Sequence, residues 1–225
     1  NLGRVMQKLN RLPEAEQQIK EALRVRQQVL GAEHLDSIRS MIDLGGVYID
    51  QQRISDAEGL LVDALSLAEK VLGTQHPYTF DALNMLASAH EAADNLEGAL
   101  SLRESGMDRR SKFLDRMLWT TGENAREGYI RLHRPELNDY LALLARMDSP
   151  DGGKKLINVS LQRKGLLLKV TSEIQQIATL SRDPTLTVLA DQLKAVRKRL
   201  AALTLSGPTA ETKGRHPEAL YELEQ

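Results

Sequence analysis

The sequence predicts an all-α chain, in which a right-handed superhelical solenoid of stacked helix pairs is followed by further helices. The first observation is an internal period of 42 residues: VLGAEH at 29–34 returns as VLGTQH at 71–76, and LGRVM at 2–6 returns as LGGVY at 44–48. The second is the composition, because aromatics are only 4% of the chain while helix-favouring Leu, Ala, Glu and Arg are abundant. A fixed period of this kind is typical of units that bury their apolar faces against their neighbours.

Each period contains two amphipathic helices, which are clearest in the second unit. Small residues at fixed places have a mechanical role there: Gly45 and Ala57 allow the two helices to approach closely, and Ala64 allows the next pair to stack. The apolar positions of this unit are Met41, Leu44, Gly45, Tyr48, Ala57, Leu61, Ala64 and Leu65. The first unit repeats them as Leu2, Gly3, Met6, Ala15, Ile19, Ala22 and Leu23.

The third unit starts regularly and then departs from the pattern. Its first helix carries Leu83, Leu86 and Ala87, but its second helix has Arg103 at a bulky apolar position and Gly106 at the stacking position. We therefore expect about two and a half units in residues 1–110, after which the array gives way to a different arrangement.

The links between units also carry structural signals. Gly31 and Gly73 suit helix C-caps, and Pro77 suits the first turn of the next helix. His34 and His76 occupy equivalent places in these links, so we expect them to cap or pack between helices and not to bind metal.

The order of residues within a unit resembles the tetratricopeptide repeat: a bulky residue, Leu-Gly and an aromatic on the first helix, then Ala, a bulky residue and Ala-Leu on the second. The unit is longer than the usual one of about 34 residues. With LGTQHPYTFDALNMLA at 72–87, it resembles the longer repeats of kinesin light chain.

This resemblance implies a concave groove, lined by the first helix of each pair, that binds a protein or peptide partner. Asn84 is the strongest candidate, because a side-chain amide both donates to and accepts from a peptide backbone. The full set of candidate groove residues is Arg4, Lys8, Arg39, Asp43, Asp50, Asp81, Asn84, Ser88 and Glu91.

From residue 111 onward the period disappears while helical patterns continue. We expect a helix over 112–119 and a break at 120–123. A restart follows near Pro135, and a loop covers 148–153. Two long helices should then form an antiparallel hairpin, whose second helix has its seam at Leu186, Leu189, Leu193, Val196, Leu200 and Leu203.

The second half resembles the helical region of bacterial CHAT proteins, in which kinesin-light-chain-like repeats precede a caspase-like peptidase domain. The resemblance rests on four segments: residues 113–131 (FLDRMLWTTGENAREGYIR), 137–144 (LNDYLALL), 161–170 (LQRKGLLLKV) and 197–208 (RKRLAALTLSGP). It implies that residues 111–225 are a helical adaptor before a missing peptidase domain, and that the chain is a fragment of a longer protein. The implied role is to bind a partner and relay that binding to the peptidase.

The residues themselves predict no enzyme activity, no cofactor and no metal site in this chain. It lacks cysteine, which excludes a thiolate nucleophile and fits a cytoplasmic location. The Gly-Gly-Lys-Lys run at 152–155 lacks the earlier glycine and the strand of a phosphate loop. No apolar run approaches the roughly 20 residues that a membrane helix needs.

Two alternatives stay open at this stage. The main alternative is a stand-alone scaffold of the kinesin-light-chain type, which binds cargo or adaptor peptides and has no enzyme attached. A basic helix face formed by Lys194, Arg197 and Lys198 could instead contact an acidic protein or the ribonucleoprotein of an RNA-guided defence system. A net charge of −1 gives no bulk preference for nucleic acid.

Overall fold

The computed structural model describes residues 2–120 and 134–147, with residues 151, 153–155, 157–159, 161, 186–189, 191, 192, 195, 196, 199 and 215. Regular structure within these ranges is helical, without a strand. The chain divides into two compact units: the first is described up to Arg110, and the second begins at Ser111. The predicted all-α fold is confirmed.

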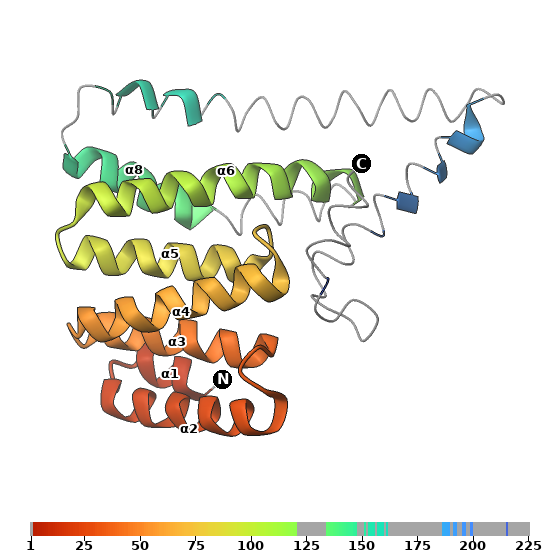
Figure 1. Cartoon of the computed structure of the whole chain (residues 1–225). Helices are drawn as coiled ribbons and strands as arrows, with labels where there is room; N and C mark the ends of the chain where they lie inside the picture. Colours follow the sequence, from red (N-terminus) through yellow and green to blue (C-terminus); the bar gives the residue numbers. More distant parts are fainter. Residues whose placement is uncertain are drawn as a thin grey trace. The chain divides into compact units, whose positions relative to one another are not determined.

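Six helices form the first unit, and from α2 to α6 they follow one another in chain order (Figure 1). They are α1 (Leu2–Lys8), α2 (Leu12–Leu30), α3 (Leu35–Asp50), α4 (Ile54–Leu72), α5 (Pro77–Ala92) and α6 (Leu96–Thr120), of which α6 continues into the second unit. Each helix from α1 to α4 packs on the next, and α3 also packs on α5. We refer to α1, α3 and α5 as the first helices, and to α2, α4 and α6 as the second helices.

The two helices of a pair approach closely at a glycine on the first helix. A Cβ atom on Gly45 would lie 2.6 Å from Cγ and Cδ2 of Leu61, and a Cβ on Gly3 would lie 2.4 Å from Cγ1 of Ile19. Real Cβ atoms do not come this near to other atoms, so glycine sets the spacing of the first two pairs. The sequence predicted this role for Gly45.

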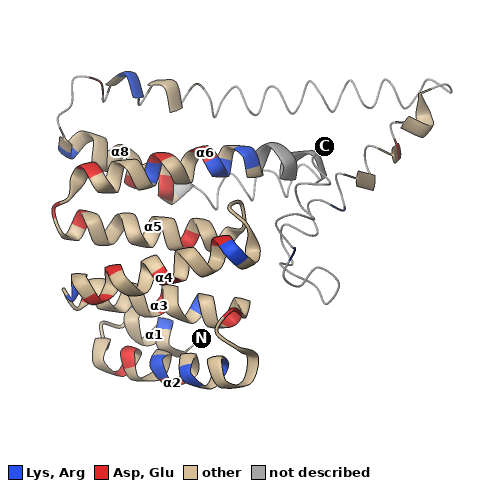
Figure 2. Ribbon diagram, in the orientation of Figure 1, with Lys and Arg blue, Asp and Glu red and all other residues tan. Residues whose placement is uncertain are grey.

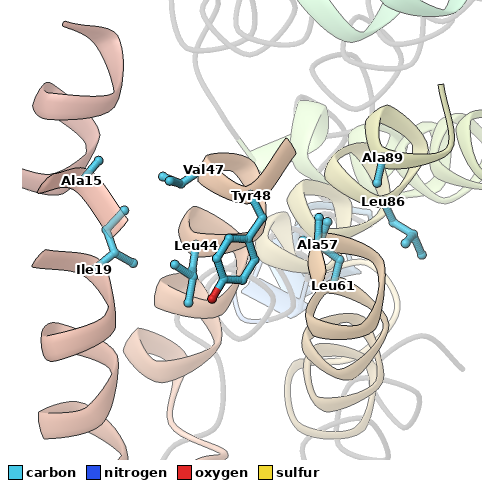
Figure 3. Packing of buried hydrophobic residues seen from close by; sticks show 9 residues of the cluster. All are labelled: Ala15, Ile19, Leu44, Val47, Tyr48, Ala57, Leu61, Leu86 and Ala89. Atoms are coloured by element: carbon cyan, nitrogen blue, oxygen red, sulfur yellow. The ribbon is translucent and has the colours of Figure 1, made fainter. Parts of the chain in front are cut away.

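Buried aliphatic residues join successive pairs into one core. Figure 3 shows Leu44 and Val47 on the side of α3 that faces Ala15 and Ile19 of α2. The same cluster contains Ala57 and Leu61 of α4 and Leu86 and Ala89 of α5. Each pair therefore buries its apolar face against its neighbours, as a solenoid requires.

Turns and links repeat with the period of the helices. The turn from first to second helix places Asn10, Gln52 and Asp94 in the left-handed region, with φ of 57°, 60° and 58°. The link to the next pair places Gly31 and Gly73 at φ of 94° and 88° as C-caps, as predicted.

The histidines of the links are helix caps. Nδ1 of His34 accepts a hydrogen bond from the Asp36 amide at 3.1 Å, and Nδ1 of His76 accepts one from the Tyr78 amide at 3.1 Å. Each satisfies an amide of the first turn that has no partner within its own helix. The expected capping role is confirmed.

The second helix of the third pair is intact although the repeat pattern departs there. This helix, α6, is continuous over 25 residues, and Ala99 and Arg103 are buried at 0% and 4% exposure. Arg103 replaces the aliphatic residue of earlier pairs by forming an ion pair with Glu91 of α5. The helix therefore keeps its place although its contact is polar.

In the second unit, helix α8 (Arg134–Met147) starts beside Pro135, where the sequence predicts a restart, and buries Tyr140, Leu143 and Leu144. Of the predicted hairpin seam, Leu186, Leu189 and Val196 are described: Leu186 is half-buried, and Leu189 and Val196 are 64% and 45% exposed. The seam residues Leu193, Leu200 and Leu203 lie outside the described residues.

Substitution of Gly45 by alanine tests the spacing of the helix pair. The added methyl group would overpack the contact with Leu61, which lowers the free energy of unfolding by about 1–3 kcal/mol. Alanine has a higher helix propensity than glycine, which offsets about 1 kcal/mol of this loss. We expect Gly45→Ala to lower the free energy of unfolding by about 1–2 kcal/mol in a urea titration. Gly59→Ala is the matched control, because no atom lies within 4 Å of its Cβ position on α4. It should stabilise the chain, and equal losses in the two variants would contradict the account.

Candidate protein-interaction surface

Five of the predicted groove residues lie on accessible parts of the first helices. Arg4 and Lys8 of α1, Asp50 of α3 and Asp81 of α5 are exposed, and Arg39 of α3 is half-buried. We call these five residues the first-helix surface. α1 contributes two cations to it and α5 contributes an anion, so its charge changes sign along the array (Figure 2).

Side-chain contacts hold this surface in place between neighbouring helices. Nε of Arg4 lies 3.5 Å from Oδ1 of Asp43, and Nε2 of Gln7 donates to Oδ2 of Asp50 at 2.8 Å. The guanidinium of Arg39 lies 5.8 Å from the ring centre of Tyr78, so it ties α3 to α5 through a cation–π contact.

Asp43 has little access to a partner. Only 9% of its side chain is exposed, and it faces Arg4. The cause is the close approach of the first helices: a Cβ on Gly46 would lie 3.4 Å from Nε2 of Gln7 and 3.5 Å from Sδ of Met85. Asp43 forms an ion pair with Arg4, and this pair joins α3 to α1.

Asn84, the strongest candidate from the sequence, lies beside α6. Its Oδ1 is 3.9 Å from the Cβ position of Gly106, and the side chain is half-buried. The period contains a signal for this placement, because the equivalent residue one unit earlier is Ile42, which is 4% exposed. Because Ile42 is apolar and buried in the second unit, the side chain at the same place in the third unit, Asn84, is expected to face the interior of the array.

Ser88 and Glu91 also contact α6, through Arg103. Nε of Arg103 donates to Oε1 of Glu91 at 2.7 Å, and its Nη2 lies 3.4 Å from Oγ of Ser88. Seven residues further along α6, Arg110 is 8% exposed and places its guanidinium 4.6 Å from the Phe80 ring centre. We call Asn84, Ser88, Glu91, Arg103 and Arg110 the α5–α6 seam.

A second charged network, which the sequence reasoning missed, surrounds Glu16 on α2. Its carboxylate accepts hydrogen bonds from Lys20 at 2.5 Å, Gln51 at 2.9 Å and Arg53 at 3.0 Å. The bond from Lys20 is the main cause that lowers the pKa of Glu16 to about 2, and the bonds from Gln51 and Arg53 act in the same direction. Arg53 also lies 4.2 Å from the ring centre of Tyr48.

Similar pairs join the second helices and their links along the array. Nζ of Lys70 lies 2.6 Å from Oε1 of Glu33, and Arg109 of α6 pairs with Glu69 of α4. Repeat spacing could have indicated these pairs, since each joins residues that are 37 or 40 positions apart. These ion pairs join neighbouring units, as expected in a stacked array.

Among the described residues, no three His, Cys, Asp or Glu side chains are grouped as a metal site would require. None of the described helices combines the length and the hydropathy of a bilayer crossing. The predicted basic face of Lys194, Arg197 and Lys198 lies outside the part of the chain that the structure describes.

Comparison with known proteins agrees with this geometry. The tetratricopeptide repeat profile matches residues 1–70 and 44–112. Residues 1–112 are a tetratricopeptide repeat array. Such arrays are generally non-catalytic scaffolds for protein–protein interaction. This agrees with the prediction from the sequence that the region binds a protein or peptide partner. The array extends through the third pair, in which Arg103 lies.

Solved structures include two crystal structures of nearly identical tetratricopeptide-like repeats of a kinesin light chain protein from Podosopora anserina. One, a point variant, is 16% identical, has a TM-score of 0.45 and covers 78% of this chain and 93% of its own. The other is 19% identical, has a TM-score of 0.46 and covers 76% and 90%. No curated protein matches the chain.

Removal of the carboxylate in the α5–α6 seam should be costly. Glu91→Ala removes the carboxylate that pairs with the 4%-exposed guanidinium of Arg103, and loss of one partner from a buried ion pair costs about 3 kcal/mol. We expect a loss of about 2–3 kcal/mol in the free energy of unfolding, because Glu91 itself is partly exposed. The control Asp63→Ala removes an exposed carboxylate from α4 and should change this quantity by less than about 0.5 kcal/mol. A similar loss in both variants would contradict the importance of the seam.

Proposed function

We propose that this chain is the partner-binding and regulatory region of a tetratricopeptide–CHAT protein, without catalytic activity of its own. The observation that carries the proposal is the tetratricopeptide array over residues 1–112, whose first helices present charged side chains. The link to a caspase-like peptidase rests on the sequence resemblance of residues 113–131, 137–144, 161–170 and 197–208.

The partner contacts the first-helix surface in this proposal. Arg4 and Lys8 supply positive charge on α1, while Asp50 and Asp81 supply negative charge on α3 and α5. A segment with acidic residues toward α1 and basic residues toward α5 is complementary to this order, and such complementarity fixes the register of binding. Asp43, Asn84, Ser88 and Glu91 support this surface from within the array.

Helix α6 is the element that relays binding in this proposal. It belongs to the third pair up to Arg110 and continues through Thr120 in the second unit. A shift of α5 against α6 at the α5–α6 seam would therefore move a helix that both units share. An energetic coupling of this kind needs an element that both sites bias.

The second candidate is a stand-alone scaffold of the kinesin-light-chain type. The 42-residue unit with its Leu-Gly-x-x-His link supports it. Both candidates bind a protein through the first helices, and they differ only in what the binding controls. A ribonucleoprotein contact through Lys194, Arg197 and Lys198 is a separate outcome that the same experiment detects.

The experiment is capture from the native host with this chain as bait, followed by mass spectrometry and by affinity measurement with the purified partner. Asp81→Lys reverses one charge of the first-helix surface, and we expect it to weaken binding at least tenfold. Asp63→Lys makes the same change on the exposed face of α4 and should bind as wild type does. Equal affinity for both variants would remove the first-helix surface from the interaction.

Addition of the purified partner to the full-length protein separates the two candidates. Cleavage of protein substrate that depends on the partner, and that Asp81→Lys reduces, supports peptidase regulation. Binding without any change in cleavage contradicts the relay and leaves the scaffold. Capture that depends on RNA and on Lys194, Arg197 and Lys198 would contradict both.

A further inference from the structure

The start of α6 has a polar side-chain cap that differs from the starts of the other second helices. Arg11 and Arg53 precede α2 and α4, and neither forms a side-chain cap hydrogen bond. Asn95 precedes α6 at the same place of the repeat, and its Oδ1 accepts a hydrogen bond from the Gly98 amide at 3.0 Å. Its side chain therefore caps α6 by satisfying an amide of the first turn.

The nitrogen of the same side-chain amide contacts the ring of His90 on α5. Nδ2 of Asn95 lies 3.1 Å from Nδ1 of His90, and Nε2 of the ring lies 3.4 Å from Oε1 of Glu58 on α4. A Cβ on Gly98 would lie 2.4 Å from Nδ1 of His90, so a glycine at this place lets the ring reach the start of α6. We call Glu58, His90, Asn95 and Gly98 the α6 cap cluster, which joins α4 to α6 through the ring.

The donors and acceptors of the α6 cap cluster fix the place of the ring proton. The Gly98 amide can only donate, so the Asn95 atom that it meets is the oxygen and the atom facing the ring is the nitrogen. That nitrogen also only donates, so Nδ1 of His90 accepts and carries no proton. The proton of the neutral ring is then on Nε2, on the side of Glu58.

Protonation of His90 is incompatible with this arrangement. Both nitrogens of the charged ring are donors, so the proton on Nδ1 would face the donor Nδ2 of Asn95. If the Asn95 amide turns over, its oxygen accepts from the ring, but its nitrogen then faces the Gly98 amide and the cap is lost. On the opposite side of the ring, the new charge makes the contact with Glu58 an ion pair. Protonation therefore exchanges the cap of α6 for an ion pair with α4.

The charges around the ring are consistent with this exchange. Glu58 is the anion that faces the ring from α4, while the start of α6 presents the uncharged Asn95. On α5 the neighbouring carboxylate of Glu91 is engaged with Arg103. The side chain of His90 is 19% exposed, so protons from the solvent reach the ring.

The second unit has the same joint without a group that titrates near neutral pH. The corresponding residues, 42 positions earlier, are Glu16 for Glu58, Tyr48 for His90 and Arg53 for Asn95. The cation there is Arg53, whose Nη1 lies 3.0 Å from Oε1 of Glu16, and a guanidinium stays charged in proteins. The third unit replaces this permanent ion pair by one that exists while His90 carries a proton.

We infer that His90 is a proton-operated switch of the α6 cap. Imidazole side chains change charge between about pH 5 and pH 8. At the upper end of this range the neutral ring supports Asn95 and α6 is capped, and at the lower end the ring binds Glu58 and the cap is released. Acidification thus loosens the first turn of a helix that continues to Thr120. The switch is independent of the proposed function, because it uses no partner and none of the first-helix surface.

The test is NMR spectroscopy of the ¹⁵N-labelled chain between about pH 5 and pH 8.5, which spans the titration of imidazole. The nitrogen resonances of the His90 ring report its proton, and we expect it on Nε2 at the upper end. The Gly98 amide resonance should shift with the same midpoint as His90. Its protection factor against exchange should fall about fivefold on acidification, which is the factor for a helix cap of usual strength.

Two variants should remove the pH response of the Gly98 amide. Asn95→Asp offers one oxygen to the Gly98 amide and the other to a proton on Nδ1, so the cap no longer conflicts with a charged ring. His90→Tyr introduces the residue type of the second unit, which does not titrate in this range. The matched control is His34→Asn, which removes the titrating cap of α3 and should leave the response of Gly98 as it is in wild type.

The ion pair of the acidic state has its own test in Glu58→Gln. We expect His90 to titrate at lower pH in this variant, because the charged ring loses its anionic partner. An unchanged titration of His90 in Glu58→Gln would contradict the ion pair.

Three further outcomes overturn the switch. One is a proton on Nδ1 of His90 at about pH 8.5, because Asn95 then has no acceptor there. Another is constant protection of the Gly98 amide while His90 titrates. The third is a pH response of Gly98 that persists in Asn95→Asp and is lost in His34→Asn, which would assign it to the other histidine.

Discussion

The close approach of a glycine on the first helix to an aliphatic residue on the second is the constraint on which the array depends. Gly3 against Ile19 and Gly45 against Leu61 bring the two helices of a pair so near that a single methyl group would not fit. This spacing lets Leu44 and Val47 reach α2 on one side, while α4 and α5 complete the same core on the other. The period of 42 residues repeats this geometry.

The third pair solves the same problem with different chemistry. Ala87 stands where the earlier pairs have glycine, and Arg103 stands where they have Ile19 or Leu61. A long guanidinium side chain reaches past the tight contact to Glu91, so burial is compensated by an ion pair. The result is a polar seam between α5 and α6, just before α6 continues into the second unit.

Sequence reasoning found the fold because period, small residues and caps act locally. It placed Gly45, His34 and His76 correctly, since a close approach and a helix start are each set by a few neighbouring residues. It could not show how far Asn84 and Asp43 are buried, because their surroundings depend on how tightly whole helices pack. It took Arg103 as a departure from the repeat pattern, since an apolar pattern cannot show that a partner carboxylate lies twelve residues earlier at Glu91.

The most direct test of this account is hydrogen–deuterium exchange, read by mass spectrometry, over α3 to α6. If the polar third pair belongs to the same cooperative stack, the amides of α5 and of residues 100–110 exchange within about tenfold of those of α3 and α4. The opposite result is fast exchange over residues 100–110 while α3 and α4 stay protected. It would mean that the array ends before α6 and that Arg103 does not hold the third pair together.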